Sequence, residues 1–174
     1  MNLTTVKDVR IGGPADLQEL HRLCLGAHAE IGLFPVDHAK VDWLLMRMVR
    51  PDLIDPGDTG TRGVIGVLGK PERLEGFALL VLSCLWYTSQ PYLAELGVYV
   101  EPDYRSRGHH KALIHWMKQQ SAMTGLPLMT GIMTTHRTEA KVRLYEREIP
   151  KIGAVFRYDP LILSSSGASS VLVH

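Results

Sequence analysis

The sequence predicts a single α/β domain, and its length, its composition and its apolar periodicity all point there. A chain of 174 residues can form one domain that buries roughly two thirds of its unfolded surface. Hydrophobic residues make up 45% and charged residues 21%, as in an ordinary globular protein. Apolar runs alternate between the helical and the strand period without an internal repeat. We therefore expect one domain over residues 1–163, followed by a Ser-rich C-terminal tail over residues 164–174.

The first third of the chain predicts a strand and two amphipathic helices. Residues 4–11 have the pattern of a strand. A helical period over residues 14–29 begins with a proline, which the first turn of a helix tolerates. A second helix over residues 41–49 ends before Pro51. Residues 51–63 are rich in Gly and Pro and predict a polar loop.

The rest of the chain predicts a strand-rich region with two further helices. The predicted strands cover residues 64–68, 76–86, 93–100, 128–133, 152–158 and 161–163, and the helices cover residues 109 to about 124 and 138 to about 147. The run Lys70-Pro71-Glu72-Arg73 separates the first two of these strands, which predicts a hairpin. Gly125 and Pro127 end the longer helix.

Residues 93–116 are the most informative stretch of the chain. An apolar strand passes through Glu101-Pro102 and a basic, glycine-containing turn into a helix. The first N–H groups of a helix have no intrahelical partner, and the helix dipole makes that end positive. Arg105, Arg107 and Lys111 add full charges. The stretch therefore predicts an anion-binding site.

The run RSRGHH over residues 105–110 resembles the pyrophosphate loop, Arg/Gln-x-x-Gly-x-Gly/Ala, of the GNAT superfamily of N-acetyltransferases. The order of predicted elements and the later Leu144-Tyr145 are also similar to that family, so the resemblance covers nearly the whole chain. His110 departs from the pattern, because the family has Gly or Ala there. A side chain at this position could obstruct the pyrophosphate, or it could turn outward and donate to a phosphate.

The resemblance implies a GNAT-like α/β fold: a mixed, mostly antiparallel central sheet with a splayed parallel strand pair and helices on both faces. The splayed strands would be residues 93–100 and 128–133, and acetyl-CoA would bind between them as a co-substrate. Gly97 suits a bulge that starts the splay, or it merely relieves crowding in a packed strand. The expected cofactor-binding residues are Val98, Val100, Arg105, Ser106, Arg107, Gly108, His109, His110 and Lys111.

Two residues are the candidates for proton transfer. The resemblance makes Tyr145 the general acid, although a tyrosine on a helix is more often part of a core. Glu95, in the strand beside the expected thioester, is the candidate base, because burial would raise the pKa of its carboxyl group. It could equally face solvent, and His136 is the competing base. Arg137 stands where the family has an asparagine that supports the cofactor arm.

A metal site is not expected. His109 and His110 are adjacent, and adjacent residues on a helix point about 100° apart, so they do not share a face. The acceptor is expected beside the connection between the first two helices, near Glu30, Phe34 and His38, with Asp37 in the same run. Carboxylates there would suit a cationic amine.

The predicted function is the transfer of an acetyl group from acetyl-CoA to a primary amine by direct attack. The alternative is a catalytically silent structural or interaction subunit of a larger assembly, such as a viral one, or of a homo-oligomer. In that case the tail, with Val171-Leu172-Val173, could add a strand to a second copy or another chain. A nucleic-acid patch is a weaker reading, since 19 Lys and Arg against 18 Asp and Glu leave the chain almost neutral.

The compartment can also be inferred from the sequence. Cys24 and Cys84 lie in apolar runs without a C-x-x-C partner, which suits reduced thiols. The N-terminus lacks an apolar signal core, and no apolar run reaches the ~18 residues of a membrane span. We therefore expect a cytoplasmic protein without membrane partners.

Overall fold

The computed structural model describes residues 8–53, 62–132 and 138–153. Its strands are β1 (Arg10–Ile11), β2 (Gly63–Lys70), β3 (Arg73–Cys84), β4 (Pro91–Val100) and β5 (Leu128–Met129). Its α-helices are α1 (Leu17–Ile31), α2 (His38–Val49), α3 (His109–Thr124) and α4 (Thr138–Glu146). Short 3₁₀ helices cover Pro14–Asp16 (η1), Pro51–Leu53 (η2) and Pro102–Arg107 (η3).

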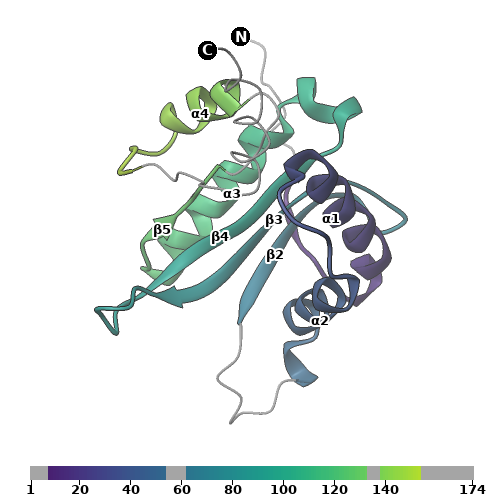
Figure 1. The fold of residues 1–174 in the computed structure, drawn as a ribbon, viewed down its shortest axis with the longest axis horizontal. Helices are drawn as coiled ribbons and strands as arrows, with labels where there is room; N and C mark the ends of the chain where they lie inside the picture. The colour runs from purple at the N-terminus through teal and green to yellow at the C-terminus, as the bar shows by residue number, and fades with distance from the viewer. Residues whose placement is uncertain (1–7, 54–61, 133–137, 154–174) are drawn as a thin grey trace, which may run out of the picture.

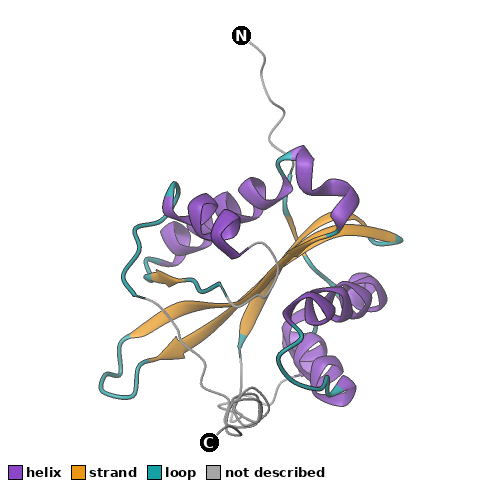
Figure 2. Ribbon diagram, turned by 45° about the horizontal axis from the view of Figure 1, so that its top comes forward, coloured by secondary structure: helices purple, strands orange, loops and turns teal. Residues whose placement is uncertain are grey.

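The strands form one sheet in the order β1-β2-β3-β4-β5. β4 and β5 are parallel, and the other neighbours are antiparallel. Figure 2 shows helices on both faces, and Figure 1 shows that α1 and α2 cover one face while α3 and α4 lie on the other. The predicted fold class, a mixed and mostly antiparallel sheet between helices, is confirmed.

Most predicted elements are confirmed, but β5 is shorter than predicted. It ends at Met129, and residues 130–132 are not in a strand. The reason is geometric: β5 leaves β4 after two paired residues, so no partner remains to continue the ladder. The first strand is predicted over residues 4–11, of which residues 4–7 lie outside the described residues. Of residues 8–11, only Arg10 and Ile11 are in β1. Residues 154–174, which include most of the predicted terminal strands and the Ser-rich tail, lie outside the described residues.

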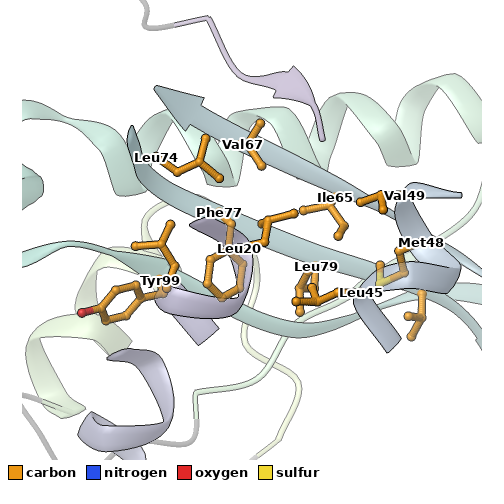
Figure 3. Close-up of a cluster of buried hydrophobic side chains, with 12 residues drawn as sticks. Leu20, Leu45, Met48, Val49, Ile65, Val67, Leu74, Phe77, Leu79 and Tyr99 are labelled. Atoms are coloured by element: carbon orange, nitrogen blue, oxygen red, sulfur yellow. The ribbon is translucent and has the colours of Figure 1, made fainter. Parts of the chain in front are cut away.

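A first core fills the space between the sheet and the helices α1 and α2 (Figure 3). It forms because the apolar stripe of each helix meets the alternate apolar residues of β2 and β3. The buried side chains of this core are Leu20, Leu23, Leu45, Met48, Val49, Ile65, Val67, Leu74, Phe77, Leu79, Val81 and Tyr99. The ring of Tyr99 brings β4 into contact with this face.

A second core lies between the sheet and α3. Leu113, Ile114, Trp116 and Met117 are almost completely buried there. Gly66 of β2 permits this packing, because a Cβ atom at that position would lie 2.6 Å from the ring of Trp116. The rigid contact fixes α3, and with it the start of that helix, against the centre of the sheet.

A β-bulge divides β4 in two. Leu80 pairs with Glu95 and Leu79 pairs with Gly97, which leaves Leu96 as an extra residue without a partner on β3. The predicted bulge is therefore present. An extra residue reverses the alternation of side chains, so that Glu95 and Val98 face the same side of the sheet as α3 and α4.

Candidate functional site

A cavity opens where β4 and β5 separate. The two strands pair only at Leu93 with Leu128 and at Ala94 with Met129, so β3 is the only described strand beside residues 95–100 of β4. The cavity has a volume of about 290 Å³. Its lining residues are Ala27, Glu30, Ile31, Glu95, Leu96, Gly97, Val98, Tyr99, Arg105, His110, Gly131, Ile132, Ala140, Lys141, Leu144 and Tyr145.

The two catalytic candidates meet across this cavity. Tyr145 Oη donates a hydrogen bond to Glu95 Oε2 over 3.2 Å. Burial raises the pKa of Glu95 to about 7, although the hydrogen bond from Tyr145 lowers it in part. Burial, and then the negative charge of Glu95, raise the pKa of Tyr145 well above its ordinary value. Near neutral pH the pair thus combines a carboxyl group close to half ionisation with a phenol that keeps its proton.

The local structure explains why these two side chains meet. Glu95 lies two residues after Leu93, which is buried in the second core, so the alternation of the strand places Glu95 on the face that α4 covers. Glu95 is intermediate in overall exposure because it lines the cavity, yet its carboxyl group is surrounded closely enough for burial to dominate its pKa. Tyr145 packs with Leu144 against the second core. The alternative interpretation of Glu95 as a solvent-facing residue is therefore wrong.

The start of α3 forms the other end of the site. Gly108 precedes the helix with a φ of +79°, a left-handed conformation that favours glycine. No heavy atom lies within 4 Å of the place where its Cβ would stand, so the backbone is open there. The backbone hydrogen bond from Ala112 N to Gly108 O, 3.0 Å long, begins the helical ladder. Earlier N–H groups of α3 can therefore point to a ligand.

The two adjacent histidines have different environments. His109 is completely buried, and its Nε2 lies 2.5 Å from Glu75 Oε2 on β3. Its side chain therefore belongs to the packing of α3, and only its backbone can contribute to an anion site. His110 instead lines the cavity. Burial and the positive charges of Arg105 and Lys141 lower the pKa of His110 to about 4, so its ring is neutral at physiological pH.

Arg105 connects the end of β4 to the cavity. Its Nε donates to Val100 O over 2.9 Å, and its Nη2 donates to Glu30 Oε1. Lys141 Nζ lies 3.7 Å from the second oxygen of Glu30. Sequence reasoning did not find Lys141. The sequence contained one signal for it: Lys141 precedes Tyr145 by four residues on a predicted helix, and residues i and i+4 share one face.

The remaining predicted cofactor residues divide into two groups. Val98 lines the cavity, whereas Val100 is fully buried in the second core. Ser106, Arg107 and Lys111 lie outside the cavity lining, on the exposed side of the turn and helix. The guanidinium of Arg107 lies over the ring of Tyr104, and Lys111 Nζ lies 3.9 Å from Glu148 Oε1. That Ser106, Arg107 and Lys111 bind the cofactor stays a prediction.

The predicted acceptor cluster is only partly assembled. Glu30 lines the cavity, whereas Phe34 is 70% exposed and Asp37 caps α2 by accepting from Lys40 N. The ring of His38 stacks on His21, with centroids 5.7 Å apart. His136 and Arg137 lie outside the described residues.

Two features that the described residues lack bear on the type of site. The described residues contain no group of His, Cys, Asp and Glu side chains that could hold a metal ion. No helix in the described part of the chain has the length and apolar character needed to cross a membrane.

Comparison with known proteins identifies the fold. No family model matches the sequence, and no curated protein matches it. Solved structures do resemble it, with identities low enough that they show the fold alone. An integron cassette protein from the mobile metagenome of Cole Harbour Salt Marsh has a TM-score of 0.64 and 19% identity, over 90% of this chain and 91% of the other.

Acetyltransferases are among these structures. A possible acetyltransferase from Clostridium difficile 630 has a TM-score of 0.62 and 14% identity, over 87% of this chain and 96% of the other. An aminoglycoside acetyltransferase from an uncultured soil metagenomic sample has the same TM-score and identity, over 87% and 94%. Together with the splayed strand pair and the turn before α3, these similarities show that the chain has the GNAT-like fold.

Proposed function

We propose that the protein is an N-acetyltransferase that uses acetyl-CoA and transfers the acetyl group to a primary amine by direct attack. The observation that carries the proposal is the hydrogen-bonded pair of Glu95 and Tyr145 in a cavity beside the open edge of β4. The names of similar solved structures, which include acetyltransferases, support it.

The donors and acceptors around the cavity fit a coenzyme A thioester. In residues 95–100 the backbone groups on the side away from β3 can pair with the amides of a pantetheine arm. The open turn at Gly108 and the positive end of α3 suit a pyrophosphate. A backbone N–H close to the bulge can polarise the thioester carbonyl.

Glu95 and Tyr145 provide the proton path. The amine nitrogen attacks the thioester carbon, the N–C bond forms and the C–S bond breaks. Glu95 accepts the proton that the amine loses, and Tyr145 Oη gives its proton to the leaving sulfur. Because Tyr145 donates to Glu95, the proton gained by Glu95 can pass to Tyr145. Both side chains then return to their starting state, and the products are an amide and free thiol.

The direct test is acetyl-CoA-dependent thiol release with a panel of primary amines. Tyr145→Phe should lower kcat by about 10²–10⁴-fold, the usual contribution of general acid–base catalysis. Tyr87→Phe, at an exposed tyrosine between β3 and β4, is the matched control and should leave kcat unchanged. Turnover of the unmodified protein should rise as the pH increases through about 7, where Glu95 loses its proton.

Two results would contradict the proposal. One is the absence of acetyl-CoA binding in calorimetry, and the other is equal activity of the Tyr145→Phe and Tyr87→Phe variants. Binding without turnover on any amine, combined with copurification of a stable complex, would favour the silent structural subunit instead.

A further inference from the structure

A second β-bulge lies beside the turn that precedes α3. Leu68 of β2 pairs with Gly76, whereas the next residue of β2 pairs with Leu74, so Glu75 is the extra residue of a bulge in β3. Gly76 also pairs with the last residue of β4, which places the bulge where β4 ends and η3 begins. A bulge redirects the side chain of its extra residue, and the side chain of Glu75 reaches the start of α3.

Glu75 contacts both ends of the turn between β4 and α3. Its carbonyl oxygen accepts a hydrogen bond of 3.0 Å from the backbone N–H of Glu101, the residue before η3. Its Oε2 atom lies 2.5 Å from Nε2 of His109, the first residue of α3. One residue of β3 thus holds the chain where it leaves β4 and again where it enters α3. Because both ends are held, fewer conformations are open to the residues between them.

The contact between Glu75 and His109 is shielded from water. The side chain of His109 is completely buried, and that of Glu75 is 25% exposed. The ring of Tyr104, from within the turn, lies beside the His109 ring with centroids 5.4 Å apart. Neither Glu75 nor His109 is among the described residues that line the cavity. The pair therefore acts on the cavity through the backbone that it holds, and a hydrogen bond in such surroundings is costly to break.

The start of α3 has no side-chain cap among the described residues. Its N-cap residue is Gly108, and its first turn contains no acidic residue. A capping side chain would stabilise the helix start, but it would occupy N–H groups that an anionic ligand needs. The contact between Glu75 and His109 joins two side chains. It therefore fixes the helix start without using any of those N–H groups.

We infer that Glu75 is a positioning residue of the coenzyme site, which holds both ends of the turn and keeps the backbone around Gly108 in the conformation that binds a pyrophosphate. The inference rests on the proposed function, because it concerns the turn that is expected to bind acetyl-CoA. A turn that is already ordered loses less conformational entropy when its ligand binds. Glu75 therefore acts on the affinity for the coenzyme and not on the chemical step.

Calorimetric titration and steady-state kinetics with acetyl-CoA test the inference. Glu75→Met removes the carboxylate and keeps the length of the side chain, so it should raise the Kd and the KM of acetyl-CoA about tenfold and change kcat by less than about twofold. Glu75→Gln keeps an acceptor oxygen and should restore most of the affinity. Glu72→Met, at an exposed glutamate in the turn between β2 and β3, is the matched control and should bind as the unmodified protein does.

A double-mutant cycle isolates this contact from the other interactions of the two residues. His109→Leu removes the ring N–H, and His115→Leu, on the exposed side of α3, is its control. The variant with both Glu75→Met and His109→Leu should bind acetyl-CoA no more weakly than the weaker single variant, because both changes remove one contact. A purely structural role would instead lower the Tm and kcat at an unchanged KM. That result, or effects of the two substitutions that multiply, would overturn the inference.

Hydrogen exchange without ligand distinguishes failure of this inference from failure of the proposed function. The amide of Ala112, which donates to Gly108 O at the start of α3, should exchange about tenfold faster in Glu75→Met than in Glu72→Met. Equal rates would overturn the inference and leave the proposed function standing. Faster exchange in Glu75→Met, with no binding of acetyl-CoA to the unmodified protein, would contradict the proposed function and still support Glu75 as the residue that holds the turn.

Discussion

The two halves of β4 differ in their neighbours. Leu93 and Ala94 pair with β3 on one side and β5 on the other. Between residues 95 and 100, every residue except Leu96 pairs with β3, and none of them pairs with another described strand. The first half holds the sheet together, and Leu93 is 7% exposed in the second core. The second half lines the cavity. One strand can therefore support the fold and present a site, because the bulge at Leu96 separates the two roles.

The largest expected effect comes from the second half. Glu95→Gln should lower kcat by about 10²–10⁴-fold, because the amide cannot accept the proton of the amine. Steady-state thiol release measures this loss, and circular dichroism checks that the fold is intact. Glu72→Gln, at an exposed glutamate in the turn between β2 and β3, is the control. Equal activity of the two variants would remove Glu95 from the proton path.

The first half should matter for stability instead. Leu93→Ala should lower the free energy of unfolding by about 2–5 kcal/mol, because it removes buried methyl groups and leaves a cavity. Leu96→Ala, in the same strand but 49% exposed, should cost less than about 1 kcal/mol. Urea denaturation measures both. Equal losses would mean that the bulge does not separate the two halves.

The raised pKa of Glu95, in the second half of β4, should lower the free energy of unfolding at high pH. Burial holds this pKa at about 7 in the folded state, against 4.5 for the ordinary group. Between these values the folded state keeps a proton that the unfolded state has lost, so stability falls as pH rises. The free energy of unfolding of the Glu95→Gln variant minus that of the unmodified protein should therefore increase by about 2–3 kcal/mol from pH 5 to pH 8. Urea denaturation at the two pH values measures the gain, and a gap that is independent of pH would contradict the raised pKa.

The smallest effects are expected at the turn beyond β4. Gly108 and Gly125 flank α3 with φ values of +79° and +68°, and no heavy atom lies within 4 Å of a Cβ at either position. Alanine at either should therefore cost a similar 1–2 kcal/mol, roughly the penalty of a left-handed residue with a Cβ. Only Gly108→Ala should also weaken acetyl-CoA binding in calorimetry. An equal effect of Gly125→Ala would show that the turn has no special part in binding.

Local features of the site could be predicted from the sequence. Gly108 follows a strand and precedes a helix, and Gly97 lies beside the bulge, because both positions depend on backbone conformation. The environment of His109 was also readable. It precedes the buried Leu113 by four residues and Met117 by eight, which places it on the apolar face of α3.

Contacts between distant segments could not be predicted in this way. Glu30 and Arg105 are 75 residues apart, and no local pattern indicates that they pair. The end of β5 was missed for a related reason. Ile132 and Met133 resume the apolar pattern after Thr130 and Gly131, but strand pairing depends on where β4 runs in space.

Hydrogen exchange of β4 with and without acetyl-CoA tests the central claim most directly. If the open half binds the coenzyme, residues 96–100 and the first turn of α3 should gain protection when acetyl-CoA is added, because their N–H groups become hydrogen-bonded. Residues 92–94, which are already within the sheet, should not change. Protection that is absent from residues 96–100 under saturating acetyl-CoA would contradict the account.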